Sequence, residues 1–179
     1  MKFARLSLAA LGAMALVASA VVTANATDYY WYGDNADLGG NGTWTAANAW
    51  GLSGGTNDQT WVNGTTNYAI FDTAGGAVSL TDSSVSVGGL SFKADGYSIS
   101  GGTLGFGTSS PINVDSGYNA SISSAITGGS LSKTGAGKLT LSGTIKLSDR
   151  LIVSGGTLAL SSATSTSKYL DVGNGTDNV

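Results

Sequence analysis

The sequence lacks cysteine, histidine and glutamate, and it has only one proline. Without cysteine there are no disulfides, so packing and backbone pairing must supply the stability of the fold. Without histidine or cysteine, no Ser-His or Cys-His pair is available to activate a nucleophile, which excludes the commonest covalent hydrolases. All eleven acidic residues are aspartates.

The first 26 residues have the pattern of a secretory signal peptide. Lys2 and Arg5 give a positive start, an apolar run follows over residues 6–22, and Ala24-Asn25-Ala26 is a small-x-small cleavage site. We therefore expect cleavage between Ala26 and Thr27 and export of the remaining chain. No later stretch is long and apolar enough to cross a bilayer, so no transmembrane segment is expected after the signal is removed.

The exported chain is weakly acidic. Removal of Lys2 and Arg5 leaves six basic residues against eleven acidic ones, a net charge of −5. The remaining lysines are scattered rather than clustered, which argues against nucleic acid as a partner.

Small and hydroxylated residues dominate the composition, with 28 Gly, 25 Ser and 20 Thr. Such a composition can indicate disorder, but Val, Leu and Ile recur throughout in alternation with Ser or Thr, and charge is low. Stretches such as 85–92 (VSVGGLSF) and 138–143 (KLTLSG) alternate with period two, as strands with one buried face do. The sequence predicts an all-β fold.

The chain after the signal divides into two parts. Residues 27–72 hold all four tryptophans, Trp31, Trp44, Trp50 and Trp61, whereas residues 73–179 carry the alternating strands. Indole faces can stack on sugars or hold a partner, so the four tryptophans are candidate ligand-binding residues. The alternative, which we favour, is an aromatic cap over the open end of a repeat fold, because such an end must be covered.

The second part contains an internal repeat. Gly-Gly pairs begin at 75, 88, 101, 128 and 155, and the last three continue as GGTL, GGSL and GGTL. Steps of 13 and 27 residues predict a solenoid with a coil of about 27 residues, built from two strand-plus-turn halves. In that register Leu104, Leu131 and Leu158 would form one buried ladder, with Leu131 the most enclosed.

Residues 134–140 (TGAGKLT) resemble a phosphate-binding loop at first sight. A Walker loop requires Ser or Thr directly after the lysine, and here Lys138 is followed by Leu139. The loop also requires a following helix, whereas residues 138–142 alternate as a strand. The sequence therefore predicts a turn followed by a strand, with Lys138 exposed.

Residues 128–143 (GGSLSKTGAGKLTLSG) resemble the autotransporter-associated β-strand repeat of secreted bacterial passenger domains. The similarity runs through Leu131, Lys133, Gly135, Gly137, Leu139, Leu141, Ser142 and Gly143, and residues 152–160, with Gly155, Gly156 and Leu158, resemble the closing part of the unit. Between them, residues 145–151 (IKLSDRL) depart from the usual YTGGT-like segment of that family. Residues 27–72 resemble, more loosely, the Trp-rich lead-in of such proteins.

The resemblance implies a right-handed parallel β-helix (β-solenoid) outside the cell, extracellular or associated with the outer membrane. It implies no catalytic residue, because the repeat is structural, and no cofactor. Autotransporters end in a membrane barrel and this sequence ends at Val179, so we expect either a fragment or another route to the surface.

Two acidic stretches and one pair of oppositely charged sequence neighbours are further candidate sites. Residues 34–41 (DNADLGGN) and 171–177 (DVGNGTD) offer oxygen ligands for calcium, but neither follows a known calcium loop, and Asp or Asn beside Gly commonly forms turns. Asp149 adjoins Arg150, the only arginine after the signal. As neighbours on a strand they would point to opposite faces, so a joint role is disfavoured and an exposed strand end is the simpler interpretation.

The sequence predicts an exported structural β-solenoid that acts as a surface stalk or adhesin-like segment without catalysis. Its partners would be surface glycans or other cell-surface proteins. The alternative is a secreted carbohydrate-binding or polysaccharide-cleaving β-helix that uses the Trp-rich part, with two aspartates as acid and base.

Overall fold

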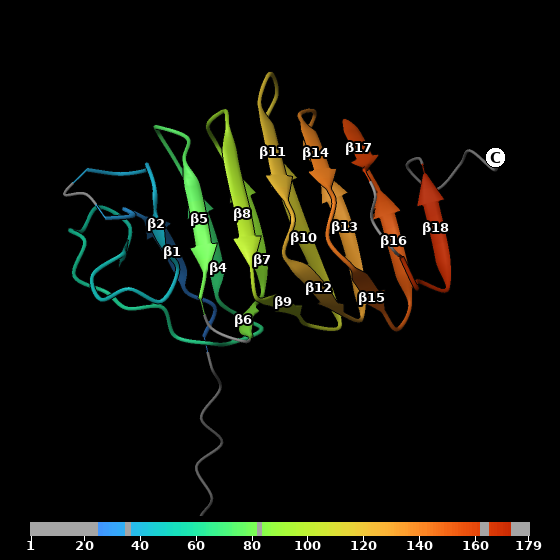
Figure 1. Ribbon diagram of the computed structural model, residues 1–179, viewed down its shortest axis with the longest axis horizontal. Helices are drawn as coiled ribbons and strands as arrows, with labels where there is room; N and C mark the ends of the chain where they lie inside the picture. Colours follow the sequence, from blue (N-terminus) through green and yellow to red (C-terminus); the bar gives the residue numbers. More distant parts are fainter. Residues whose placement is uncertain (1–24, 35–36, 82–83, 162–164, 173–179) are drawn as a thin grey trace, which may run out of the picture.

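The computed structural model describes residues 25–34, 37–81, 84–161 and 165–172. These residues form eighteen β-strands and no helix, stacked as coils along one axis from the N-terminal to the C-terminal end (Figure 1). The predicted signal peptide lies outside the described residues, apart from the two residues before its cleavage site.

Three sheets run along the axis. The first sheet has eight strands in the order β18-β16-β13-β10-β7-β4-β1-β3. Its neighbouring strands pair in parallel, except β1 and β3, which are antiparallel. The strands are β1 (Asp28–Trp31), β3 (Trp50–Gly51), β4 (Tyr68–Phe71), β7 (Gly89–Phe92), β10 (Ser109–Val114), β13 (Ser130–Thr134), β16 (Arg150–Val153) and β18 (Tyr169–Val172).

The second and third sheets are entirely parallel. The second sheet contains β2 (Gly42–Thr43), β5 (Ala77–Leu80), β8 (Tyr97–Gly101), β11 (Asn119–Ile122), β14 (Lys138–Leu141) and β17 (Thr157–Leu160). The third sheet contains β6 (Val85–Val87), β9 (Thr103–Phe106), β12 (Ala125–Gly128) and β15 (Ile145–Leu147).

The chain visits the three sheets in turn, one strand in each. Successive triplets β4-β5-β6, β7-β8-β9, β10-β11-β12 and β13-β14-β15 each complete one coil with three faces. The predicted fold class, an all-β parallel β-solenoid with an aromatic cluster at its N-terminal end, is therefore confirmed. The predicted boundary at residue 72 between an N-terminal cap and the solenoid stays a prediction. Strands β2 and β4 precede this boundary and pair in parallel with β5 and β7 after it, and β1 pairs in parallel with β4.

The predicted coil of about 27 residues is wrong. Ser130 lies opposite Ser109, 21 positions earlier, and Leu151 lies opposite Leu131, 20 positions earlier. Three short strands fit into each coil instead of two. The GGTL and GGSL segments lead into β9, β13 and β17, which belong to the third, first and second sheets. From one such segment to the next, the chain therefore completes one coil and moves on to the next sheet.

The predicted leucine ladder is wrong for the same reason. Leu104 stacks between Val85 and Ile126, and Leu131 lies between Ser110 and Leu151. Leu158 follows Leu139 in a third row. Leu104 and Leu131 both point inward with 0% and 1% of their surface exposed, whereas Leu158 is only half-buried, so Leu131 is not the most enclosed of the three.

The segment TGAG is a turn, as predicted. Gly135 has a left-handed φ of 72°, a conformation that favours glycine. A Cβ at Gly135 would collide with the backbone carbonyl of Val114, and one at Gly137 with that of Asp115, in the coil before. These two glycines therefore let successive turns stack at strand spacing.

Candidate functional site

The four tryptophans form one buried cluster at the N-terminal end of the solenoid. Trp50 lies at its centre, with ring centroids 4.8 Å from Trp31, 4.8 Å from Trp44 and 5.0 Å from Trp61. Trp31, Trp44 and Trp50 have no exposed surface, and Trp61 has 7%. The cluster continues into the solenoid interior through Phe71, whose ring packs 5.8 Å from that of Trp50.

Most indole nitrogens in this cluster are satisfied by backbone carbonyls. Trp50 Nε1 donates to the Trp44 carbonyl at 2.7 Å, Trp31 Nε1 to Gly40 at 2.9 Å and Trp61 Nε1 to Ser86 at 3.2 Å. Trp44 Nε1 is buried and has no hydrogen-bond partner. These rings present no face to solvent, so their burial favours the cap over sugar stacking.

Strand β3 closes the edge of the first sheet at the same end. It runs antiparallel to β1, with Trp50 opposite Trp31, so the parallel stacking stops there. On the other side of β3, Trp50 exchanges two backbone hydrogen bonds with Gln59, of 2.9 and 3.2 Å. Backbone pairing and aromatic packing thus cover this end of the solenoid together.

Lys138 does not belong to a nucleotide site. It opens β14, its side chain is exposed, and a strand rather than a helix follows the glycines. The positive end of a helix, which a phosphate loop requires, is therefore absent from residues 134–141. The turn-and-strand prediction is confirmed, together with the exposure of this lysine.

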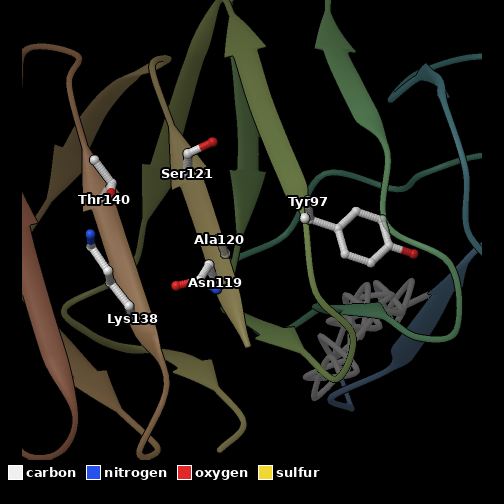
Figure 2. A pocket seen from close by; sticks show the side chains of 7 residues that line it. Tyr97, Asn119, Ala120, Ser121, Lys138 and Thr140 are labelled. Atoms are coloured by element: carbon white, nitrogen blue, oxygen red, sulfur yellow. The ribbon is translucent and has the colours of Figure 1, made fainter. Parts of the chain in front are cut away.

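Lys138 instead lines an open groove on the outer face of the second sheet (Figure 2). The groove has a volume of about 340 Å³. It is lined by Gly96, Tyr97, Asn119, Ala120, Ser121, Lys138 and Thr140, which come from three successive coils.

The register of the strands brings the polar side chains of the groove together. Asn119 pairs with Lys138 and Ser121 with Thr140, so an amide, an amine and two hydroxyls share one outer face. Figure 2 shows the Tyr97 ring turned away from the other labelled side chains. Its hydroxyl donates to the Asp72 carbonyl at 2.8 Å, and burial, with the nearby Asp72 charge, raises the Tyr97 pKa above its usual value.

An aspartate fixes one wall of the groove. Asp95 Oδ1 accepts hydrogen bonds from the Asn119 side chain at 3.0 Å and from the Asn119 backbone N–H at 2.7 Å. These bonds hold the Asp95 pKa below its usual value, so the carboxylate stays charged. The Lys138 amine and the Ser121 and Thr140 hydroxyls can therefore donate hydrogen bonds to a hydroxylated ligand, and Asp95 can accept one.

The sequence analysis predicted the strand that carries Lys138 and its exposure, but not the groove itself. The structure adds Asn119 and Ser121 of the neighbouring strand β11, whose side chains share the outer face with Lys138 and Thr140. The hollow beside them lies at Gly96, where a Cβ would meet nothing within 4 Å. Only the coil register shows that this glycine lies beside Asn119, whose carbonyl accepts the Gly96 N–H at 3.0 Å.

Lys133 is a buried lysine whose burial the sequence analysis did not anticipate. It lies on the inner face of β13, with 1% of its surface exposed. Its Nζ donates to the carbonyls of Thr134 at 2.6 Å, Gly135 at 2.9 Å and Gly155 at 3.1 Å, and so joins the turns of two successive coils. Burial lowers the Lys133 pKa from its ordinary value of 10.5.

We predict that Lys133→Met lowers the free energy of unfolding by about 1–3 kcal/mol at pH 7, because the donors of three buried carbonyls are lost. Burial makes the folded state disfavour the charged lysine. The free energy of unfolding of the wild type should therefore increase as the pH rises from the lowered pKa of Lys133 towards 10.5. The cost of the substitution should therefore be larger at pH 10.5 than at pH 7. Urea melts of both proteins at the two pH values measure this difference, and a cost that shrinks with pH contradicts it.

Where the structure describes the two acidic stretches, it shows no gathering of carboxylates. Within residues 25–34, 37–81, 84–161 and 165–172, no three Asp, Glu, His or Cys residues lie close enough to share a metal. The Asn41 side-chain oxygen already accepts the Ala77 N–H at 2.7 Å. Asp171 pairs with Arg150 at 3.0 Å, and most of the second stretch lies outside the described residues.

The prediction that Asp149 and Arg150 point apart is wrong. Arg150 Nε lies 3.8 Å from Asp149 Oδ1, because Asp149 belongs to the bend before β16 rather than to the strand. Both side chains are half-exposed, which agrees with their interpretation as an exposed strand end.

Among the residues that the structure describes, no helix is long and apolar enough to cross a membrane.

Comparison with known proteins gives one informative similarity. Over 148 residues the chain is 38% identical to a protein described as "Adhesin BmaC autotransporter" from Brucella suis biovar 1 (strain 1330). The aligned region covers 79% of this chain and 4% of that protein, so the chain spans only a small part of the relative's length. No family model and no solved structure matches the chain.

Proposed function

We propose, on the premise that this chain is a repeat protein of the autotransporter passenger type, that it serves at the cell surface as an adhesin-like or stalk-like segment without catalysis. The observation that carries the proposal is the similarity to an adhesin across 79% of the chain, in a fold that is a continuous stack of parallel coils. Backbone hydrogen bonds run along the axis in three sheets, so the stack is an extended and stiff body. Such a body suits the display of a surface away from a membrane.

Within this role we propose that the groove of Gly96, Asn119, Ser121, Lys138 and Thr140 contacts surface glycans. Its exposed amine and amide and its half-buried hydroxyls are groups that hydrogen-bond to sugar hydroxyls. The Lys138 amine supplies the positive charge of the groove and the Asp95 carboxylate on its wall a negative one, so the groove suits a neutral sugar whose hydroxyls hydrogen-bond to both.

Binding of the purified, exported chain to a glycan array and to cultured cells tests the proposal. The double variant Asn119→Ala/Lys138→Ala should reduce binding about tenfold or more, which corresponds to the loss of one or two hydrogen bonds to a charged group. Lys146→Ala is the matched control, since Lys146 is also an exposed strand lysine but lies on the third sheet. No binding by the wild type, or equal losses in the two variants, would contradict a role for this groove.

A second candidate function is carbohydrate binding or cleavage through the Trp-rich part. The burial of all four indoles disfavours it, because sugar stacking requires an accessible ring face. A test by Trp44 or Trp50 substitution also confuses binding with folding, since both rings lie in the core.

A further inference from the structure

Thr73 has an unusual backbone conformation in the turn between β4 and β5. Its φ is 62°, in the left-handed region, and among the described residues other than glycine only Asn48 shares this property. A β-branched residue is an outlier in that region, because its side chain crowds the backbone. Strained residues persist only where the surrounding structure enforces them, and they cluster at active sites and switch regions.

The strained turn is held on both sides by packing and by hydrogen bonds. Phe71, two positions before Thr73, has no exposed surface. On the other side, Ala74 forms a β-bridge with Gly39. The Thr73 hydroxyl donates to the Leu38 carbonyl. The turn therefore cannot relax without the loss of these contacts.

The left-handed φ places the Thr73 side chain next to the carbonyl carbon of Asp72. At a φ of about −60° the Cβ of a residue lies anti to the carbonyl carbon before it, whereas at the φ of Thr73 it lies gauche to that carbon. From a gauche Cβ, a hydroxyl can close a ring onto the carbonyl carbon through Oγ1, Cβ, Cα and N. The Asp72–Thr73 peptide bond is thus arranged for attack by the Thr73 hydroxyl.

Two further groups contact the same peptide bond. The hydroxyl of Tyr97, a residue with 1% of its surface exposed, donates to the Asp72 carbonyl oxygen at 2.8 Å. Burial, and then the charge of Asp72, raises the pKa of Tyr97 above its usual value, so the phenol keeps its hydrogen. A buried donor at this position stabilises the oxyanion that forms on attack. Asp72 Oδ1 accepts the Thr73 N–H at 2.7 Å, so a carboxylate lies beside the nitrogen that would leave.

We propose that the chain cleaves itself between Asp72 and Thr73. Thr73 Oγ1 leaves the Leu38 carbonyl and attacks the Asp72 carbonyl carbon, while Tyr97 donates to the oxyanion. The C–N bond then breaks, and the hydroxyl proton passes through the Asp72 carboxylate to the Thr73 nitrogen, which becomes a free amine. Thr73 is exposed, so water reaches the ester that results. Hydrolysis leaves Asp72 with a terminal carboxylate and restores the Thr73 hydroxyl.

The two parts of the solenoid stay associated after this cleavage. Strand β4 precedes the cleaved bond and pairs with β7 after it, and β2 pairs with β5 in the same way. The reaction takes place once within a chain and acts on no other molecule. It therefore goes beyond the surface role proposed above and does not depend on it.

Intact-mass measurement of the purified, exported chain during incubation at pH 7 tests the proposal. We expect two fragments in place of the whole chain, one that ends at Asp72 and one that begins at Thr73. The rate should not depend on protein concentration, because the reaction is intramolecular. Hydroxylamine should accelerate the cleavage and leave a hydroxamate on Asp72, because it attacks the ester. The two fragments should elute together in gel filtration without denaturant.

Substitutions separate self-cleavage from cleavage by a contaminating protease. Thr73→Ala should stay intact, whereas Thr73→Ser keeps the hydroxyl and should cleave. Tyr97→Phe should cleave about tenfold more slowly or less, since the donor to the oxyanion is lost. Thr66→Ala is the matched control and should cleave as the wild type does, because Thr66 is also exposed but has no left-handed φ.

Circular dichroism melts confirm that each variant is folded. A wild type that stays intact, or cleavage of Thr73→Ala at the same bond, would overturn the proposal.

Discussion

Replacing Trp50 with alanine should lower the free energy of unfolding by about 3–5 kcal/mol, the range for truncation of a buried tryptophan. Trp50 has no exposed surface and contacts the rings of Trp31, Trp44 and Trp61 with centroids 4.8–5.0 Å apart. The substitution also removes the hydrogen bond from its indole nitrogen to the Trp44 carbonyl.

Denaturant melts followed by circular dichroism measure the effect of Trp50→Ala on the whole solenoid. Stability in a stack of coils depends on the contacts between neighbours, so loss of the end cover should weaken the adjacent coils as well. Leu52→Ala is the control, because Leu52 is 43% exposed in the same part of the chain and should cost less than about 0.5 kcal/mol. A loss at Trp50 as small as that at Leu52 would show that the tryptophan cluster does not close the solenoid.

Leu131→Ala should cost about 2–5 kcal/mol, and Ser132→Ala less than about 0.5 kcal/mol. Leu131 is 1% exposed and stacks between Ser110 and Leu151, so its removal leaves a cavity between coils. Ser132 is the next residue of the same strand and faces outward, where its hydroxyl lies 3.1 Å from that of Ser154.

The contrast between the two substitutions tests the period-two burial, and a double-mutant cycle tests the coil register. Leu131→Ala and Leu151→Ala remove neighbours of one row, so their effects should be strongly coupled. Leu131→Ala and Leu104→Ala act in different rows, on the first and third sheets, and their coupling should be smaller. Stronger coupling of Leu131 with Leu104 would support the 27-residue ladder instead of the observed register.

The strand character of the chain could be predicted from sequence because it depends on local order. In β13 and β14, residues alternate between the interior and the outside as their period-two pattern indicates, and the glycines of TGAG form a turn. The same alternation placed Lys138 on the surface. The length of the coil could not be predicted from the Gly-Gly spacing. Turns that recur every 27 residues can stack in one coil of 27 residues, or they can lie at different corners of shorter coils, as they do here.

Strand alternation and the absence of histidine, cysteine and glutamate were thus determined by the sequence itself, because each is a property of neighbouring residues or of composition. Tertiary structure alone decided which side chains meet across coils. It buried the four tryptophans, brought Lys133 to the Gly155 carbonyl one coil away, and placed Lys138 beside Asn119. The last two contacts join residues about 20 positions apart, and that separation is fixed only when three strands and their turns close one coil.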